Sequence, residues 1–376
     1  EWQLSDGQLG VLSGIVAVMV GLLTFPLSLA ADRWGRAKSL AVMAILWSLA
    51  TLYCAIASTY QEMLLGRALV GVGEAAYGSV GIALVISVFP SRLRATLSAA
   101  FMAGGLFGQV LGVALGAQIA AAHGWRQAFF VIGMGGLILG LIYPLLVRDR
   151  RINALAGTDP SASSQASIPA LKGLFASRSV RLAYVGSGLQ LFAAGALPAW
   201  LPTYFNRYYG LPLDQAGRRA AVLLLICGLG MILCGILTDR LTRNRAERKI
   251  SLAILFSLGT AASLSLAFAL PPGPAQFALL ALAMFLVAAT TGPAGAMVAN
   301  LTPLALHGSA FATLTLANNL IGLAPGPILT GRLADGLGLA DALNLLPIPC
   351  VLAACAFAAM QRSYIADLGN TGPRHA

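Results

Sequence analysis

The sequence predicts an all-α protein that crosses a membrane many times. Its residues are 58% hydrophobic and only 10% charged, with a mean hydropathy of +0.81, whereas soluble domains carry about 25% charged residues. The apolar runs are uninterrupted and about 20 residues long, which is the length of a bilayer-spanning helix. They lack the two-residue alternation of a transmembrane β-barrel. Together these observations exclude a soluble protein and favour a polytopic helical one.

The apolar runs, taken in chain order, predict eleven membrane spans. Short loops rich in Gly, Pro or charged residues separate most of the runs, as expected where a chain leaves the bilayer. The expected spans cover residues 8–31, 38–57, 62–88, 97–121, 126–147, 182–204, 217–238, 250–270, 277–298, 310–331 and 341–360.

The positions of Lys and Arg set the expected orientation. These residues collect in alternate loops, after the spans that end near residues 31, 88, 147, 238 and 360, and such enrichment marks cytoplasmic loops. We therefore expect an integral protein of a bacterial inner membrane, with its N-terminus outside and its C-terminus in the cytoplasm. Because the net charge of +11 lies in these short loops, nucleic acid is not an expected partner.

Two halves of the chain resemble one another. The stretch DRWGRAK begins at Asp32 and DRLTRNRAERK begins at Asp239, an interval of 207 residues. A fainter pair, PSRLRAT at Pro90 and PLALHGS at Pro303, lies 213 residues apart. Parallel repeats of this kind are typical of transporters. We expect an N-terminal bundle at 1–147, a cytoplasmic linker at 148–180 and a C-terminal bundle at 181–376, with the first of twelve helices missing before Glu1.

The apolar stretch from Leu64 to Val88, within the span at 62–88, carries two charged residues, Arg67 and Glu74. Seven residues make almost two helical turns, so both side chains leave one face about 10 Å apart. Charges at this depth usually face a bundle interior or a water-filled cavity, and Gly71 and Gly73 between them allow close approach of another backbone. We expect this face to line a transport path. An ion pair that only joins two helices is the alternative interpretation.

Several stretches resemble the major facilitator superfamily of transporters. SLAADRWGRAK resembles the loop signature of that superfamily, with Ser28 in place of its usual first Gly, and GILTDR at 235–240 resembles the second copy. GRALVGVG resembles its fourth-helix motif. RALVGVGEAAY, WLPTYFNRYYGL and NLIGLAPGPILTGRLAD are similar to the spinster family of lipid transporters within it. The implied fold is two pseudo-symmetric helical bundles.

The resemblance implies a gating loop. Gly35 suits a tight turn, and the basic residues of this loop can bind the cytoplasmic leaflet or nearby carboxylates; a topology signal alone is the alternative. The expected gating residues are Asp32, Arg33, Gly35, Arg36, Lys38, Asp239 and Arg240. His307 stands where the family usually has Arg, and the acidic residue that the family carries on its first helix has no counterpart here.

Polar residues inside other spans are candidates for a substrate cavity, and interhelical hydrogen bonds are the alternative for each. They are Tyr77, Gln190, Asn318 and Asn319. Asn318 and Asn319 precede Pro325-Gly326-Pro327, so we expect that helix to be polar and then broken, as at transporter binding sites. Glycines recurring every four residues from Gly104 to Gly116 predict a surface for close helix packing.

The expected function is secondary active transport by alternating access, driven by protons that Glu74 binds on one side and releases on the other, with Arg67 as its partner. Because cavity polarity is sparse, an amphipathic or lipid-like substrate is favoured over a small organic anion or drug. A non-transporting sensor or remnant is the alternative from another class, and a membrane enzyme is disfavoured because no nucleophile and base cluster together. We expect protons, substrate and membrane lipids as partners, a monomer, and no cofactor or metal.

Overall fold

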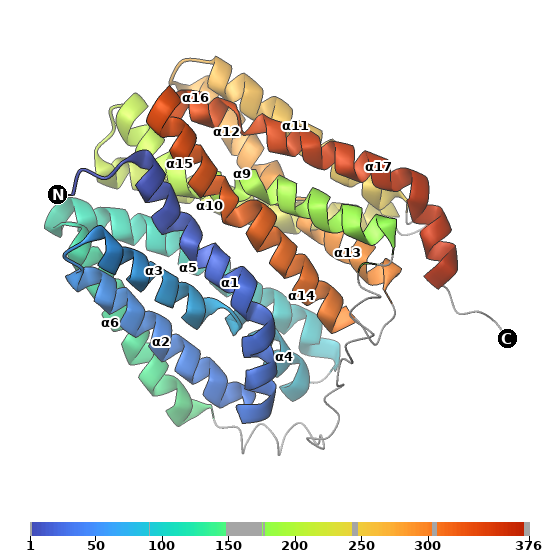
Figure 1. Ribbon diagram of the computed structural model, residues 1–376, viewed down its shortest axis with the longest axis horizontal. Coiled ribbons are helices and arrows are strands. Elements are labelled where there is room, and N and C mark those ends of the chain that lie inside the picture. Colours follow the sequence, from blue (N-terminus) through green and yellow to red (C-terminus); the bar gives the residue numbers. More distant parts are fainter. Residues whose placement is uncertain are drawn as a thin grey trace. The chain divides into compact units, whose positions relative to one another are not determined.

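The computed structural model describes residues 2–89, 91–147, 175, 177–242, 247–302 and 307–371. A few side chains within these ranges, including those of Asp32 and His307, also lie outside the described part, as does almost all of the expected linker at 148–180. The helices are α1 (Asp6–Trp34), α2 (Arg36–Ile56), α3 (Tyr60–Glu74), α4 (Tyr77–Val88), α5 (Ser91–His123), α6 (Trp125–Leu146), α9 (Arg178–Tyr208), α10 (Leu213–Thr242), α11 (Arg248–Ala269), α12 (Pro274–Val287), α13 (Thr291–Leu301), α14 (His307–Ala317), the π-helix η3 (Asn318–Leu323), α15 (Pro325–Leu337), α16 (Leu339–Asn344) and α17 (Pro347–Thr371) (Figure 1).

The predicted all-α membrane fold is confirmed. Within the described residues, ten segments are long and apolar enough to span a membrane. The expected span at 310–331 is divided among α14, η3 and α15, which confirms the predicted break. Two other expected spans, 62–88 and 277–298, are each divided into two helices, which hydropathy did not predict because the turn residues Ala75-Ala76 and Ala288-Ala289 continue the apolar run.

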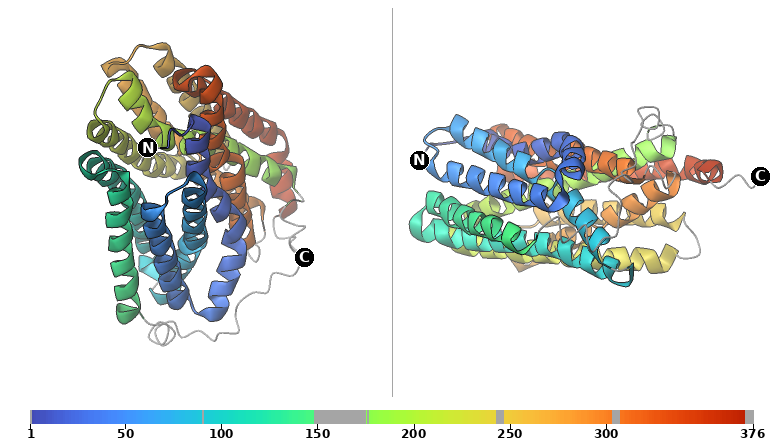
Figure 2. Two further views of the ribbon diagram at one scale, coloured as in Figure 1. Left: turned by 60° about the vertical axis from the view of Figure 1, so that its left-hand side comes forward. Right: turned by 90° about the horizontal axis from the view of Figure 1, so that it is seen from below.

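The chain forms two compact units, and two helices belong to both. Unit 1 contains residues 1–4, 11–163 and 210–222, and unit 2 contains residues 5–10, 164–209 and 223–376. Therefore α1 begins in unit 2 and continues in unit 1, whereas α10 begins in unit 1 and continues in unit 2. Within each unit the long helices lie side by side with their axes roughly aligned, and successive ones such as α1 and α2 run in opposite directions (Figure 2).

Small residues allow the helices of unit 1 to pack closely. α2 packs against α6 and α3, and α5 packs against α6. One core cluster, which includes the turn between α3 and α4, contains Ala31, Leu40, Met43, Ala76 and Val80. Alanine and glycine dominate such contacts because lipid chains offer no hydrophobic drive, so close van der Waals packing must hold the helices together.

Unit 2 has the larger core. It joins α9, α11, α13, α14 and α17, and its buried aromatic residues Tyr184, Phe357 and Tyr364 are each at most 3% exposed. η3 packs against α9, where Gly188 approaches the carbonyl of Ala317 and Gly195 approaches that of Leu323. These glycines leave room for the irregular π-helical backbone.

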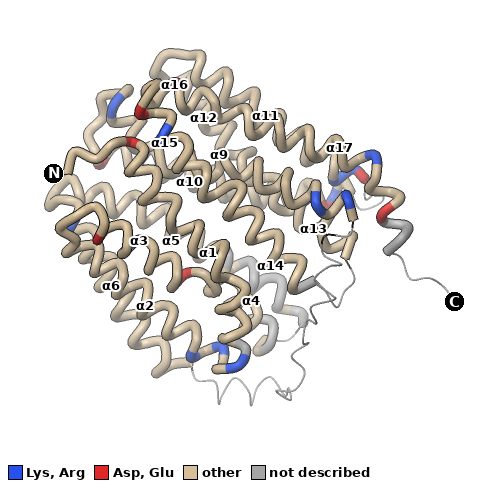
Figure 3. The backbone as a smooth tube through the Cα atoms, viewed as in Figure 1, with Lys and Arg blue, Asp and Glu red and all other residues tan. Residues whose placement is uncertain are grey.

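The outer faces of the helices are apolar, as lipid requires. Large hydrophobic side chains such as Leu139 (69% exposed) and Leu255 (62% exposed) point outward, which in a soluble protein would favour aggregation. Figure 3 shows that Lys, Arg, Asp and Glu gather mostly at helix ends. The glycine repeat on α5 differs from its prediction: a Cβ atom at Gly104, Gly108 or Gly112 would meet no atom within 4 Å.

Candidate functional site

Glu74 is the last residue of α3, at a break inside a membrane span. α3 ends at Glu74, Ala75 and Ala76 form a turn, and α4 begins at Tyr77. The side chain of Glu74 is exposed, and no hydrogen bond or ion pair joins it to another described residue. A carboxylate is electrostatically unfavourable at a helix C-terminus, which carries partial negative charge. An acidic group kept in this place therefore indicates a role other than stabilising the helix.

Hydroxyl groups from α1 stabilise the break. The hydroxyl of buried Thr24 lies 2.6 Å from the carbonyl oxygen of Ala75, freed by the turn, and 2.5 Å from that of Val20 in its own helix, so its one proton is shared between these two acceptors. Ser79 donates to the carbonyl of Ala76 at 3.0 Å and shares a 2.7 Å hydrogen bond with Ser28. A freed carbonyl in lipid is costly unless it finds a donor. The side chains of α1 thus make it possible for the span to break directly after Glu74.

Arg67 lies on the same helix as Glu74 but is held by α1. Its Nε donates to the carbonyl of Leu12 at 3.0 Å, and the residue is half-buried. Among the described residues, Arg67 and Glu74 form no ion pair. Two turns of α3 separate them, about 10 Å along the axis, so the guanidinium is oriented by backbone contact and the carboxylate stays available.

The close approach predicted at Gly71 and Gly73 is confirmed. A Cβ atom at Gly71 would lie 2.7 Å from the carbonyl oxygen of Val16 in α1, and one at Gly73 would lie 2.7 Å from the backbone nitrogen of Trp47 in α2. Trp47 also packs edge-on against Tyr77, with ring centroids 4.9 Å apart. The two glycines fix α3 against its neighbours and so fix the position of Glu74.

Unit 2 has a second break inside a span, between α12 and α13, and Gln190 lies against it. Gln190 is fully buried, and its Nε2 donates to the carbonyl of Val287 at 3.2 Å and to Oγ1 of Thr260 at 3.1 Å. A carbonyl can only accept, so the nitrogen of the amide must face Val287. Gln190 therefore stabilises this break as Thr24 stabilises the other.

Three buried oxygen atoms near this second break have no hydrogen-bond partner among the described residues. They belong to Gln190 (Oε1), Ser257 (Oγ) and Thr290 (Oγ1). Ser257 lies one helical turn from Thr260, and Thr290 lies just beyond Val287. Buried polar atoms are normally paired with protein or ordered water, so this cluster marks a polar spot inside the apolar unit.

Asn318 and Asn319 begin the π-helix η3, at the place where a polar and then broken helix was predicted. Asn318 accepts a hydrogen bond from Ser187 of α9 at 2.7 Å. Asn319 is 6% exposed, and its side-chain nitrogen donates to the carbonyl of Thr315 at 2.9 Å. The backbone carbonyl of Asn319 accepts a hydrogen bond from the backbone nitrogen of Ala324. Single π-helical turns occur often at functional sites.

The described part of the gating loop has the expected turn. Gly35 has φ 104° and ψ 128° and precedes α2, a conformation that residues with a Cβ atom rarely adopt. Arg36 donates to the carbonyl of Ala83 on α4 at 3.4 Å. Arg33, Lys38, Asp239 and Arg240 are exposed; the side chain of Asp32 lies outside the described residues.

In unit 1 the structure places Arg67 and Glu74 on α3 without a direct bond between them, and Tyr77 at the start of α4. In unit 2 it places Gln190 on α9 and Asn318 and Asn319 on η3, which packs against α9. Inspection of the sequence missed Thr24, Ser28 and Ser79 in unit 1 and Thr260 in unit 2. Hydroxyl residues spaced four apart in an apolar run, as at Thr24 and Ser28, were the available signal, but such residues usually bond only within their own helix.

Comparison with known proteins identifies relatives of this chain. The profile of the Major Facilitator Superfamily matches residues 1–327. A "Probable L-galactonate transporter" from Escherichia coli is 26% identical over 65% of this chain, which spans only 56% of that protein. A "Putative metabolite transport protein" from Haemophilus influenzae is 28% identical, covering 90% of this chain and 82% of its own length. A "Probable 4-methylmuconolactone transporter" from Cupriavidus pinatubonensis is 28% identical over 68% of this chain and 58% of its own.

Solved structures share the fold. An inward-facing, occupied bacterial homologue of the human lysosomal transporter Spinster has a TM-score of 0.81 at 20% identity, covering 97% of this chain and 91% of the other. A D-xylose-proton symporter has a TM-score of 0.70 at 20% identity, covering 94% and 88%. These identities are low, so the likeness concerns the fold alone.

Proposed function

This chain belongs to the major facilitator superfamily, and we propose that it is a proton-coupled secondary transporter whose coupling group is Glu74. Its family and fold are those of transporters and not of enzymes. The observation that carries the proposal is the position of Glu74: a carboxyl group inside a membrane span, at a helix break, exposed and with no hydrogen bond or ion pair to another described residue. Intramembrane ionisable residues commonly form proton relays.

Arg67 is the second member of this coupling site. Its guanidinium is anchored by one hydrogen bond to Leu12, which leaves the other nitrogens to attract an anion. When Glu74 is ionised, Arg67 stabilises the negative charge; when Glu74 is protonated, an anionic substrate can take the place of that charge. A site that changes its net charge in this way couples proton binding to substrate binding.

The two helix breaks and the gating loop would carry the motion of the cycle. A break concentrates bending at one place, and at both breaks a side chain from another helix holds a freed carbonyl. The residues of the gating loop, Asp32, Arg33, Gly35, Arg36, Lys38, Asp239 and Arg240, would form and release contacts as the transporter changes state, as their position in the superfamily's loop signature suggests.

For the substrate we favour a small organic anion over an amphipathic, lipid-like molecule. Relatives at 26% and 28% identity are named for L-galactonate and for 4-methylmuconolactone, both small and oxygen-rich. Arg67 in unit 1 suits such an anion, because the carbonyl of Leu12 engages only its Nε. The sparse polarity of the remaining spans supports the amphipathic alternative. We also propose the bacterial inner membrane, a cytoplasmic C-terminus and a monomeric unit of function.

Uptake into proteoliposomes tests this proposal. Purified protein is reconstituted, a proton gradient is imposed, and accumulation of L-galactonate, 4-methylmuconolactone and a lysophospholipid is measured beside substrate-induced proton movement. Glu74→Gln should reduce the accumulation ratio to about 1, because an uncoupled carrier can only equilibrate its substrate. Exchange of substrate without a gradient should persist. Arg67→Ala should weaken both accumulation and exchange.

Glu62→Gln is the matched control, because Glu62 lies in the first turn of the same helix that Glu74 ends. It accepts a hydrogen bond from the backbone of Ser58 at 2.6 Å, which a glutamine oxygen can also accept. This control should transport as the wild type does. Uphill accumulation by Glu74→Gln with unchanged proton movement would remove Glu74 from the coupling mechanism.

A further inference from the structure

The break between α12 and α13 gathers buried polar atoms that the chain does not pair. Four buried side-chain oxygen atoms lack a hydrogen-bond partner in the described part of the chain, and three of them lie here: Oε1 of Gln190, Oγ of Ser257 and Oγ1 of Thr290. Each of these three residues is 0% exposed. Native proteins rarely leave such atoms unpaired, so three of them in one place indicate a missing partner.

The bonds of Gln190 place the three atoms near one another. Its Nε2 donates to Oγ1 of Thr260 on α11 at 3.1 Å and to the carbonyl of Val287 at the end of α12 at 3.2 Å. Ser257 lies three residues before Thr260 and therefore shares its face of α11. Thr290 lies three residues after Val287, in the turn that follows α12. Each hydroxyl is thus about one turn from a group that the amide bonds.

The oxygen of this amide cannot exchange places with its nitrogen. The hydroxyl of Thr260 already donates its proton to the carbonyl of Phe256 at 2.8 Å, so towards Gln190 it can only accept. The carbonyl of Val287 can only accept as well. Both contacts therefore require the nitrogen of Gln190, and its oxygen stays on the side where the chain supplies no donor.

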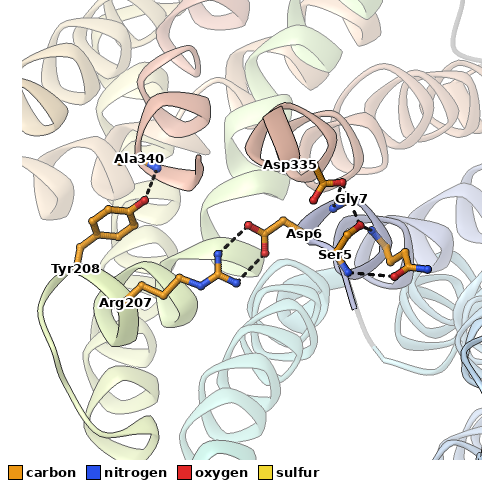
Figure 4. Close-up of polar contacts among 8 residues, drawn as sticks. Ser5, Asp6, Gly7, Arg207, Tyr208, Asp335 and Ala340 are labelled. Atoms are coloured by element: carbon orange, nitrogen blue, oxygen red, sulfur yellow. Dashed lines mark hydrogen bonds and ion pairs between the residues drawn. The ribbon is translucent and has the colours of Figure 1, made fainter. Parts of the chain in front are cut away.

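Another buried glutamine of unit 2 shows how the chain alone can satisfy an amide. Gln276 is 1% exposed; its Nε2 donates to the hydroxyl of Tyr204 at 2.9 Å, and its Oε1 accepts from the hydroxyl of Tyr209 at 2.8 Å. Polar groups nearer the surface of the unit are paired too, since the hydroxyl of Tyr208 accepts from the backbone nitrogen of Ala340 at 3.1 Å (Figure 4). The amide at the break is paired through its nitrogen only.

The two hydroxyl groups also depart from the usual pattern. Ser263 of α11 donates to the carbonyl of Gly259, one turn earlier, at 2.7 Å, as serine in a helix commonly does. The described residues offer Ser257 no such bond. Thr290 precedes α13, but its side chain caps none of the first N–H groups of that helix, although threonine is favoured for capping. Both hydroxyls therefore keep their capacity to donate and to accept.

The chemistry of the three groups selects water as their partner. A cation would satisfy the three oxygen atoms but would leave two hydroxyl protons buried without an acceptor, and its charge would be buried among neutral groups. A water molecule donates two hydrogen bonds and accepts two. It can therefore donate to the amide oxygen and accept from both hydroxyls, and three partners is the usual number for a buried water.

We propose that unit 2 binds an ordered water molecule at the α12–α13 break, held by Gln190, Ser257 and Thr290. The water joins α9, α11 and the turn before α13. Unit 1 joins its own break to a neighbouring helix directly, through the hydroxyl of Thr24. A bridging water re-forms its bonds when its partners shift slightly, so it suits a place where the backbone of a span changes direction.

A double-mutant cycle tests whether Ser257 and Thr290 share this water, because no direct bond joins them. Ser257→Ala and Thr290→Val are made singly and together in the full chain, and the melting temperature is measured in detergent. Each single substitution should lower it by a few degrees. The double variant should melt close to the less stable single variant, because one loss already weakens the water and the second then removes an unpaired polar atom.

Ser263→Ala provides the matched control. Ser263 lies on the same helix as Ser257 and is nearly as buried, at 4% exposed, but it donates within that helix. Its loss should add to that of Thr290→Val in the corresponding double variant. Additive losses for Ser257→Ala with Thr290→Val, equal in kind to this control, would overturn the shared water.

An experimental map that resolves ordered water provides the second measurement, and it needs no variant. The wild-type protein should show a density peak within hydrogen-bonding distance of Gln190 Oε1, Ser257 Oγ and Thr290 Oγ1. The melting temperature should be the same in sodium chloride and in choline chloride, because water requires no ion. Absence of the peak, or melting that rises with sodium, would overturn the proposal. Neither measurement involves substrate or protons, so the transport function proposed above can fail while the water site stands.

Discussion

Ser79 and Thr291 make the same hydrogen bond in the two units: each donates to the carbonyl three residues earlier, that of Ala76 in one and Ala288 in the other. Both bonds lie just after a break that divides a membrane span, after α3 in unit 1 and after α12 in unit 2. The repeat inferred from loop sequences therefore extends to the irregular backbone within the spans. Unit 1 places a carboxylate at its break, whereas unit 2 places neutral polar groups there.

The bond from Thr24 to the break should contribute measurably to stability. Thr24→Val keeps the shape of the side chain but leaves the carbonyl of Ala75 without this donor. We expect a loss of about 1 kcal/mol in the free energy of unfolding, measured in detergent by chemical denaturation. Thr51→Val is the control, because Thr51 bonds only within its own helix, to the carbonyl of Trp47. Equal losses in the two variants would show that the break does not depend on Thr24.

The turn of the gating loop should require glycine at position 35. Gly35→Ala places a Cβ atom on a residue with φ 104°, which costs about 1–3 kcal/mol, so thermal stability and uptake rate should both fall. Gly104→Ala lies in the interior of α5 with open space around the added methyl group, and it should be neutral or slightly stabilising. A Gly35→Ala protein as stable as Gly104→Ala would contradict the strained turn.

The orientation of the chain remains a prediction that labelling can decide. Single cysteines at Gln3 and Glu247, both exposed, should react with a membrane-impermeant maleimide from opposite sides in intact cells and inverted vesicles. The reason is the excess of Lys and Arg in the loop that contains residue 247 and its absence near residue 3. Reaction of both positions from the same side would contradict the assignment of cytoplasmic loops.

The sequence alone determined the class of protein, the order of its helices, the repeat, the superfamily and the break before Pro325. These features depend on local composition. An apolar run enters lipid because of its own residues, a proline breaks a helix because it lacks an N–H group, and Gly35 can form the turn because it has no Cβ atom. The sequence likewise marked Glu74 and Arg67, because a charge inside an apolar run is costly wherever the run lies.

Only the tertiary structure decided where the other spans break and what holds the breaks. No proline or charge follows Glu74 in Ala75-Ala76, and the break there depends on Thr24, 51 residues away in the chain. The orientation of the Gln190 amide depends in the same way on the carbonyl of Val287, 97 residues away. In lipid a freed backbone carbonyl needs a donor from the protein itself, and which donor arrives is settled by packing between helices that lie far apart in sequence.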